Sequence, residues 1–176
     1  MKNNKTKRHE GRADLIGEHT FGDRGQLILL AIFLIIWITD SFIFNYSTSL
    51  QDKIPNSIRM LIGFPILIIA GIFAKYRLGI VFGEVRDKPE VIEKSVFKIV
   101  RHPIYLGSIL LYLGLTILTC SIASTLIWVI IVIFYYYISK YEEKLLLKKF
   151  GKEYKNYMER VPMLIPLKYK KKKHEK

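Results

Sequence analysis

Residues 104–138, IYLGSILLYLGLTILTCSIASTLIWVIIVIFYYYI, contain no charged residue and decide the fold class. Cys120 and Ser121 divide this stretch into two runs, each close to the roughly 20 residues that cross a hydrocarbon core. We therefore expect a tight helical hairpin with almost no connecting loop. With the apolar runs on either side, the sequence predicts an all-α integral membrane protein with about four transmembrane helices, at residues 27–45, 60–74, 104–119 and 122–138.

Basic residues lie in short segments beside these apolar runs. Of 176 residues, 51% are hydrophobic, and 28 Lys and Arg oppose 15 Asp and Glu, which gives a net charge of +13. Basic residues that flank apolar spans favour anionic lipid head groups over nucleic acid as partners. We therefore expect membrane lipids, and no nucleic acid, around a single membrane domain at residues 26–166. A basic segment at 1–25 precedes this domain and a basic tail at 167–176 follows it.

The distribution of the basic residues also predicts the orientation of the chain. Six lie before the first span, seven in the connection at 75–101 and thirteen after the fourth span, whereas the two other connections hold two and none. Lys and Arg gather in cytoplasmic loops. The sequence therefore predicts a multi-pass membrane protein with both termini in the cytoplasm.

The segment after the fourth span mixes aromatic and charged residues. Apolar positions interleave with Glu and Lys at Tyr141, Leu145, Phe150, Tyr154 and Tyr157, and the pattern is interrupted at Gly151. Such an arrangement is typical of a helix that lies along a membrane surface. We expect an interfacial amphipathic helix here.

Isolated reactive residues give no support for a disulfide or a metal centre. Cys120 is the one cysteine, and the four histidines lack ligand-like spacing. Asp40 is an acid inside an apolar run, which makes it a functional candidate. Its neighbours Thr39 and Ser41, and its position near the outer end of the first span, favour a hydrogen-bonded residue at a helix end instead.

Two polar clusters flank the hairpin. RHPIYLG, at residues 101–107, opens its first helix; a capped helix whose Arg101 reaches lipid phosphates accounts for this stretch as well as a functional site does. Glu142 and Glu143 follow its second helix and fit a solvated face as well as a site. The two arms of a hairpin should bring the clusters together. Because adjacent helical residues point about 100° apart, we expect only one of the two acids to face the resulting pocket fully.

Together the clusters resemble a family of membrane enzymes, the isoprenylcysteine carboxyl methyltransferases, with phospholipid N-methyltransferases as more distant relatives. The resemblance covers residues 88–166 and rests on RHPIYLG at 101–107, EE at 142–143 and FGKEYKNYMERVP at 150–162. It implies a cytosolic S-adenosylmethionine site formed mainly by residues 88–162. By position, the cofactor would contact Pro89, Glu90, Val91, Ile92, Phe97, His102, Pro103, Ile104, Tyr105 and Glu142.

Two positions depart from the family. Eukaryotic members place an arginine, implied to serve the substrate carboxylate, about one helical turn before the first Glu, and this chain has Ile138 there. Phe97 also replaces a usual tyrosine. The candidate catalytic residues are Glu142 and Arg160. Arg160 is included because it, or Lys140, is a cation that could take the place of the missing arginine.

The predicted function is transfer of a methyl group from S-adenosylmethionine to a lipophilic or lipid-anchored substrate at the cytoplasmic membrane face. Two alternatives stay open. NADPH-dependent membrane reductases of sterol type share an Arg-x-Pro-x-Tyr signature, but they usually follow the glycine with an acid, whereas Ser108 follows Gly107 here. The other alternative is a small membrane scaffold without enzymatic activity.

Overall fold

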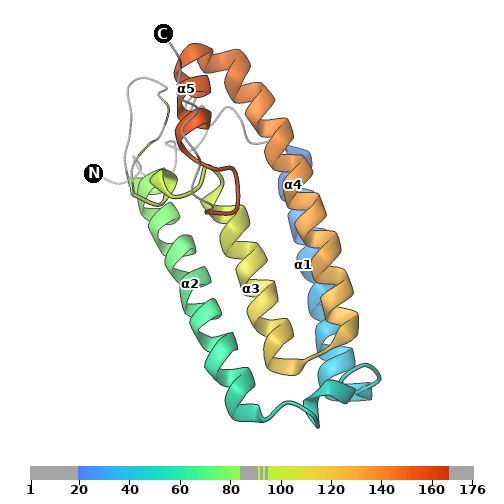
Figure 1. The fold of residues 1–176 in the computed structure, drawn as a ribbon. Coiled ribbons are helices and arrows are strands. Elements are labelled where there is room, and N and C mark those ends of the chain that lie inside the picture. The colour runs from blue at the N-terminus through green and yellow to red at the C-terminus, as the bar shows by residue number, and fades with distance from the viewer. Residues whose placement is uncertain (1–19, 84–90, 92, 94, 167–176) are drawn as a thin grey trace, which may run out of the picture.

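The computed structural model describes residues 20–83, 91, 93 and 95–166, and all regular structure in these ranges is helical (Figure 1). The four long helices are α1 (Thr20–Ile38), α2 (Asn56–Gly83), α3 (Pro103–Thr119) and α4 (Ile122–Phe150). A π-helical segment, η3 (Thr39–Phe44), continues α1, and α5 (Lys152–Arg160) is a short last helix. Two 3-10 turns, η4 (Ser49–Gln51) and η5 (Ser95–Lys98), lie in the connections. The all-α prediction is confirmed; the basic segments 1–19 and 167–176 lie outside the described residues.

Three segments of these helices are long and apolar enough to cross a membrane: Arg24–Phe44, Asn56–Lys75 and Ile122–Phe150. The helix α3 is apolar as well, but it has 17 residues. Large aliphatic side chains cover the outer faces of the bundle, as Leu27 and Leu61 illustrate with exposed fractions of 65% and 74%. Helices with such apolar outer faces belong in lipid, where the intrahelical hydrogen bonds satisfy the backbone. The chain is a membrane protein.

Three helices extend beyond the predicted spans, and α1 does so by beginning at Thr20. α2 passes through Pro65 without ending and reaches Gly83. α4 continues past residue 138 to Phe150, because the Lys, Glu and Leu residues there are strong helix formers with no Gly or Pro among them. The predicted amphipathic segment is therefore divided, since only α5 forms a separate short helix. The chain turns at Gly151, whose φ of 53° suits glycine.

The turn between α3 and α4 is as short as predicted. Cys120 ends α3 in the left-handed conformation, and Ser121 caps α4 by accepting a hydrogen bond from the Ser124 amide at 3.0 Å. α3 nevertheless packs mainly against α2, whereas α4 packs about equally against α3 and α1. Glycine permits the close α2–α3 approach: a Cβ atom added at Gly114 would lie 2.6 Å from Leu67 Cδ2. Figure 1 shows α5 beside the end of α4 and above the start of α3.

Candidate active site

Backbone pairing at one end of the bundle places the start of α3. The amides of Arg101 and His102 donate hydrogen bonds to the carbonyls of Pro162 and Met163, at 2.9 and 3.1 Å. This pairing requires α5 to fold back from the end of α4. Pro103 then occupies the first helical position of α3, where its missing amide hydrogen has no cost.

The long α4 helix carries Glu142 and Glu143 to the same place, where they meet Arg101, His102 and Tyr105. We call these five residues the polar cluster. The Tyr105 hydroxyl donates a hydrogen bond to Oε1 of Glu142. The other carboxylate oxygen of Glu142, Oε2, lies 3.4 Å from Nδ1 of His102. The Glu142 side chain keeps 15% of its surface exposed, so one edge of the cluster is open.

Glu143 is the more buried acid and pairs with the two basic residues. Its Oε1 lies 2.8 Å from Nε of Arg101 and 3.4 Å from Nε2 of His102. Arg101 also donates from Nη1 to the Met158 carbonyl at 3.0 Å, and its side chain is only 9% exposed. Arg101 therefore points into the protein, and the interpretation in which it reaches lipid phosphates is wrong.

Both acids reach the cluster, which differs from the expectation that only one would face it fully. The reason is His102, which presents Nδ1 to Glu142 and Nε2 to Glu143 and so bridges two directions that a helix holds about 100° apart. Burial alone would lower the pKa of His102. The negative charges of Glu142 and Glu143 beside the two ring nitrogens outweigh burial, so the pKa of His102 is raised from its ordinary value.

Stacked aromatic rings support the polar cluster. The ring of His102 stacks on that of Tyr105, with centroids 5.5 Å apart and planes 6° apart, and Tyr105 stacks in turn on Tyr135 at 5.0 Å. From α5, the Tyr157 hydroxyl donates a 2.7 Å hydrogen bond to the carbonyl of Phe97. These contacts hold the imidazole and the phenol in fixed orientations.

Other residues that the resemblance assigned to the cofactor surround the cluster. Pro103 is fully buried, and Ile104 packs partly buried against the core of Tyr105, Phe33 and their neighbours. Val91 packs against Tyr154, Tyr157 and Val161, and Phe97 packs against the neighbouring core of Val96 and Val100. Pro89, Glu90 and Ile92 lie outside the described residues.

Arg160 does not join the cluster. It lies on the open side of α5, where its side chain is 58% exposed, its Nη2 is 2.7 Å from Glu93 and its Nε donates to the Asn156 carbonyl. Lys140, the other candidate cation, is exposed on α4 with its ammonium 4.8 Å from the Tyr136 ring centre. Neither lies in the polar cluster, and a substrate-binding role for either in place of the missing arginine stays a prediction.

Arg101 and Glu143 lie in the polar cluster but were not among the predicted cofactor contacts. Each directly adjoins an assigned residue, so the signal was their position beside His102 and Glu142. For Glu143, the angle of about 100° between adjacent helical residues had favoured only one acid in the pocket.

Comparison with known proteins places this geometry in a family. Residues 57–153 match the model of the phospholipid methyltransferase family, a segment that includes most of α2, all of α3 and both glutamates. Methanethiol S-methyltransferase 1 of Bradyrhizobium diazoefficiens is 35% identical over 84 residues, 48% of this chain and 29% of that protein. Protein-S-isoprenylcysteine O-methyltransferase B of Arabidopsis thaliana is 31% identical over 78 residues, 44% of this chain and 40% of that protein.

The matched segments thus span less than half of either relative. No solved structure gives a significant match. The family match, by contrast, covers more than half of this chain and agrees with the resemblance that its motifs indicated. The chain belongs to the phospholipid methyltransferase family.

Proposed function

We propose that this protein is an integral membrane methyltransferase that uses S-adenosylmethionine and acts on a lipophilic substrate at the cytoplasmic membrane face. The observation that carries the proposal is the polar cluster, in which the start of α3 and the far part of α4 bring a cation, an imidazole, a phenol and two carboxylates together. All five residues lie within the segment that matches the family.

The polar cluster fits such a cofactor chemically. Nε of Arg101, Nε2 of His102 and Oε1 of Glu143 are buried and face one another at ion-pair distances, yet none has an aligned hydrogen bond among the described residues. Buried polar atoms without aligned partners are costly unless a ligand completes them. S-adenosylmethionine carries a carboxylate, an ammonium group and ribose hydroxyls, which complement these cations and anions, and an adenine that suits aromatic neighbours.

The chemistry asked of the protein is mainly positioning. S-adenosylmethionine, when bound, supplies a methyl group that is already activated by its sulfonium. Glu142, the acid at the open edge, would accept hydrogen bonds from an amino or hydroxyl group, while Tyr105 and His102 fix its carboxylate. Arg101 and Glu143 would hold this end closed to water. Orientation of a nucleophile in a water-poor site accounts for a large part of such rate enhancements.

The cytoplasmic placement of the polar cluster rests on the basic residues, of which 26 of 28 fall on one side of a four-span topology. Reporter fusions at the two termini test it. Activity of a cytoplasmic reporter at both ends supports the proposal, and opposite sidedness of the ends would contradict both the orientation and the four-span topology.

For the substrate we propose a lipophilic nucleophile without a carboxylate, which enters from the bilayer. Ile138 is partly buried against the core on α4, and the two other candidate cations are engaged elsewhere. A carboxylate without a cationic partner stays better solvated by water than by this site. Radiolabelled methyl transfer to a total lipid extract should exceed transfer to an S-farnesyl cysteine analogue, and Ile138→Arg should shift the ratio toward the analogue. Efficient wild-type turnover of the analogue, with no lipid product, would refute the substrate proposal.

Calorimetric titration of the detergent-solubilised protein tests the cofactor. We expect S-adenosylmethionine and S-adenosylhomocysteine to bind and NADPH not to bind. Binding of NADPH alone would favour a reductase, and binding of none of the three would favour a scaffold. The variant Lys144→Gln changes a charge at an exposed position beside the two acids on α4. It should bind S-adenosylmethionine as the wild type does.

A further inference from the structure

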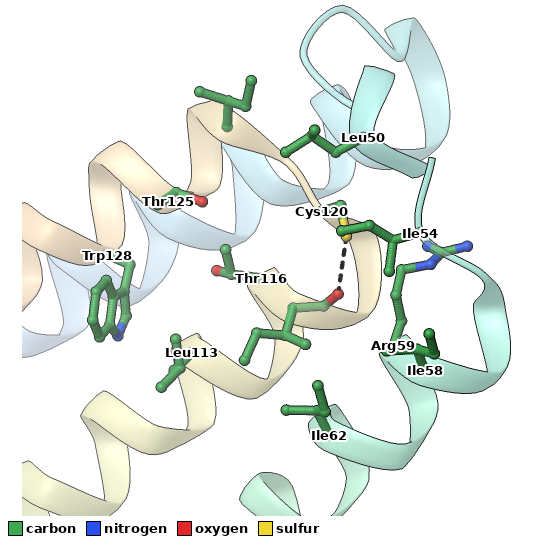
Figure 2. Close-up of a pocket in the computed structure, with 12 residues that line it drawn as sticks. Leu50, Ile54, Ile58, Arg59, Ile62, Leu113, Thr116, Cys120, Thr125 and Trp128 are labelled. Carbon is green, nitrogen blue, oxygen red and sulfur yellow. Dashed lines mark hydrogen bonds between the residues drawn. The ribbon is translucent and has the colours of Figure 1, made fainter. Parts of the chain in front are cut away.

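A hollow lies at the end of the bundle opposite to the polar cluster. Here α2, α3, α4 and the connection before α2 enclose a pocket of about 350 Å³ (Figure 2). Its walls are mainly aliphatic, with Ile58, Ile62, Leu113, Ile117 and Ile122 among the lining residues. Leu113 is eight residues beyond Tyr105 on α3, about 12 Å along the axis at 1.5 Å per residue. The pocket is therefore separate from the proposed methyl-transfer site.

The polar side chains that line this pocket are already bonded to the backbone. The Thr116 hydroxyl donates to the Tyr112 carbonyl and the Thr125 hydroxyl to the Ser121 carbonyl, both at 2.8 Å. The indole of Trp128 likewise donates to the Ile109 carbonyl at 3.0 Å. These groups have no hydrogen left to offer a ligand, so the wall between the helices suits a hydrocarbon chain.

Arg59 is the exception in the lining. Its Nη1 donates to the Leu118 carbonyl at 2.7 Å, whereas its Nε is buried without a hydrogen-bond partner among the described residues. Within that part of the chain, no carboxylate forms an ion pair with it. Arg59 lies in the first turns of α2, at the end of the apolar segment Asn56–Lys75, which is the level of lipid head groups. Its charge is thus available at the rim of an apolar pocket.

We propose that this pocket binds one acyl chain of an anionic phospholipid whose phosphate pairs with Arg59. The guanidinium presents a fork of donors that matches phosphate oxygens, and basic pockets between transmembrane helices are a known way to hold lipid head groups. A volume of about 350 Å³ lies in the lower part of the range for ligand pockets, which suits a segment of one chain. The lipid belongs to the membrane leaflet opposite to the polar cluster.

Lipid retention tests the head-group preference. The full-length wild type, Arg59→Gln and the matched charge control Lys53→Gln, at an exposed position outside the lining, would be reconstituted with equal phosphatidylcholine and phosphatidylglycerol and extracted for native mass spectrometry. We expect the wild type to retain phosphatidylglycerol preferentially. Arg59→Gln should reduce this preference about fivefold, the factor for about 1 kcal/mol per basic residue at a membrane surface, and Lys53→Gln should not.

Cys120 provides a second readout, because the one cysteine of the chain lines the same pocket. Added phosphatidylglycerol should slow alkylation of Cys120 by N-ethylmaleimide in the wild type and should not do so in Ile62→Trp, which fills the pocket from a half-exposed position and leaves Arg59 in place. Equal retention of both lipids by the wild type, or equal protection by phosphatidylcholine or by a free fatty acid, would overturn the proposal. Binding of S-adenosylmethionine in the same samples tests the active site independently.

Discussion

The two ends of the bundle each bury a carboxylate, and they satisfy it in different ways. Asp40 is 7% exposed, and its oxygens accept hydrogen bonds from the Ser47 amide at 3.0 Å and from the hydroxyls of Ser47 and Ser121. Glu143 is equally buried, but it faces the charged Arg101 and the imidazole of His102 without an aligned hydrogen bond on Oε1. Neutral hydrogen-bond donors therefore satisfy Asp40, whereas Glu143 relies on the charge of its partners.

The difference separates a structural role for Asp40 from the proposed binding role of the polar cluster. Neutral donors from two connections tie Asp40 to the end of α1 and to the α3–α4 turn, as predicted for a hydrogen-bonded residue at a helix end. Buried charged partners with unaligned atoms are costly to separate, and a ligand with its own charges and donors could complete them.

Glu143→Gln should lower the apparent free energy of unfolding by about 3 to 5 kcal/mol, because it leaves the charge of Arg101 buried without compensation. Titration with SDS in bicelles measures this quantity. The double variant Arg101→Gln, Glu143→Gln should recover part of the loss, since it removes both charges. A loss below about 1 kcal/mol in the single variant would mean that the pair is solvated.

Glu142→Gln should act on binding more than on folding. We expect the affinity for S-adenosylmethionine to fall roughly 10- to 150-fold, the range for losing a hydrogen bond to a charged group of about 1.5 to 3 kcal/mol. The amide oxygen can still accept from the Tyr105 hydroxyl, so unfolding should change less than in Glu143→Gln. Calorimetry measures the affinity, with the exposed Glu159→Gln as control. Equal and negligible losses of affinity in the Gln variants of Glu142 and Glu143 would mean that both acids belong to a solvated helix face.

Asp40→Asn should act on folding more than on cofactor binding. Replacing the carboxylate weakens its hydrogen bonds to Ser47 and Ser121, which should cost about 1 to 2 kcal/mol of stability. The affinity for S-adenosylmethionine should be unchanged, because Asp40 lies at the other end of the bundle. The same SDS and calorimetric titrations measure both quantities. A loss of cofactor affinity comparable to that of Glu142→Gln would remove the distinction between the ends.

Much of this arrangement follows from local sequence. An uncharged run divided at Cys120 and Ser121 predicts the hairpin, and α3 begins within one residue of the predicted position. The meeting of RHPIY with the two glutamates follows from the same hairpin. These features depend on hydrophobicity and on helix geometry, which short-range patterns record.

The directions in which the side chains of Arg101 and Arg160 point could not be predicted from hydrophobicity and helix geometry. Arg101 points inward because α5 folds back and supplies the Met158 carbonyl, and Arg160 points outward for the same reason, toward Glu93. The fold-back depends on the turn at Gly151 and on the backbone pairing of residues 101–102 with 162–163. Periodicity within one helix carries no information about such long-range contacts.

The stability of the polar end should depend on pH through His102. Its pKa is raised above the ordinary value of 6.5, chiefly by Glu142 and Glu143 against the opposing effect of burial. The protonated imidazole therefore stabilises the fold fully below pH 6.5, and this contribution is lost as the pH rises through the raised pKa. We expect the apparent free energy of unfolding to decrease over that range in the wild type. His102→Gln should remove the decrease and His174→Gln, in the tail, should retain it.

Two tyrosines of α5 offer the smallest and most closely matched test of how the fold-back is held. Both are buried, with exposed fractions of 3% for Tyr154 and 2% for Tyr157, but only Tyr157 donates a described hydrogen bond, to the Phe97 carbonyl. Tyr157→Phe should therefore lower the free energy of unfolding by about 0.5 to 1.5 kcal/mol, the usual net value of one hydrogen bond. Tyr154→Phe removes a hydroxyl of the same size and should cost less. Because Arg101 reaches the Met158 carbonyl on the same helix, a loosened α5 should also weaken cofactor binding slightly in Tyr157→Phe. If the two variants lose equal stability, the ring packing of α5 holds the fold-back, and the hydroxyl of Tyr157 contributes nothing to it.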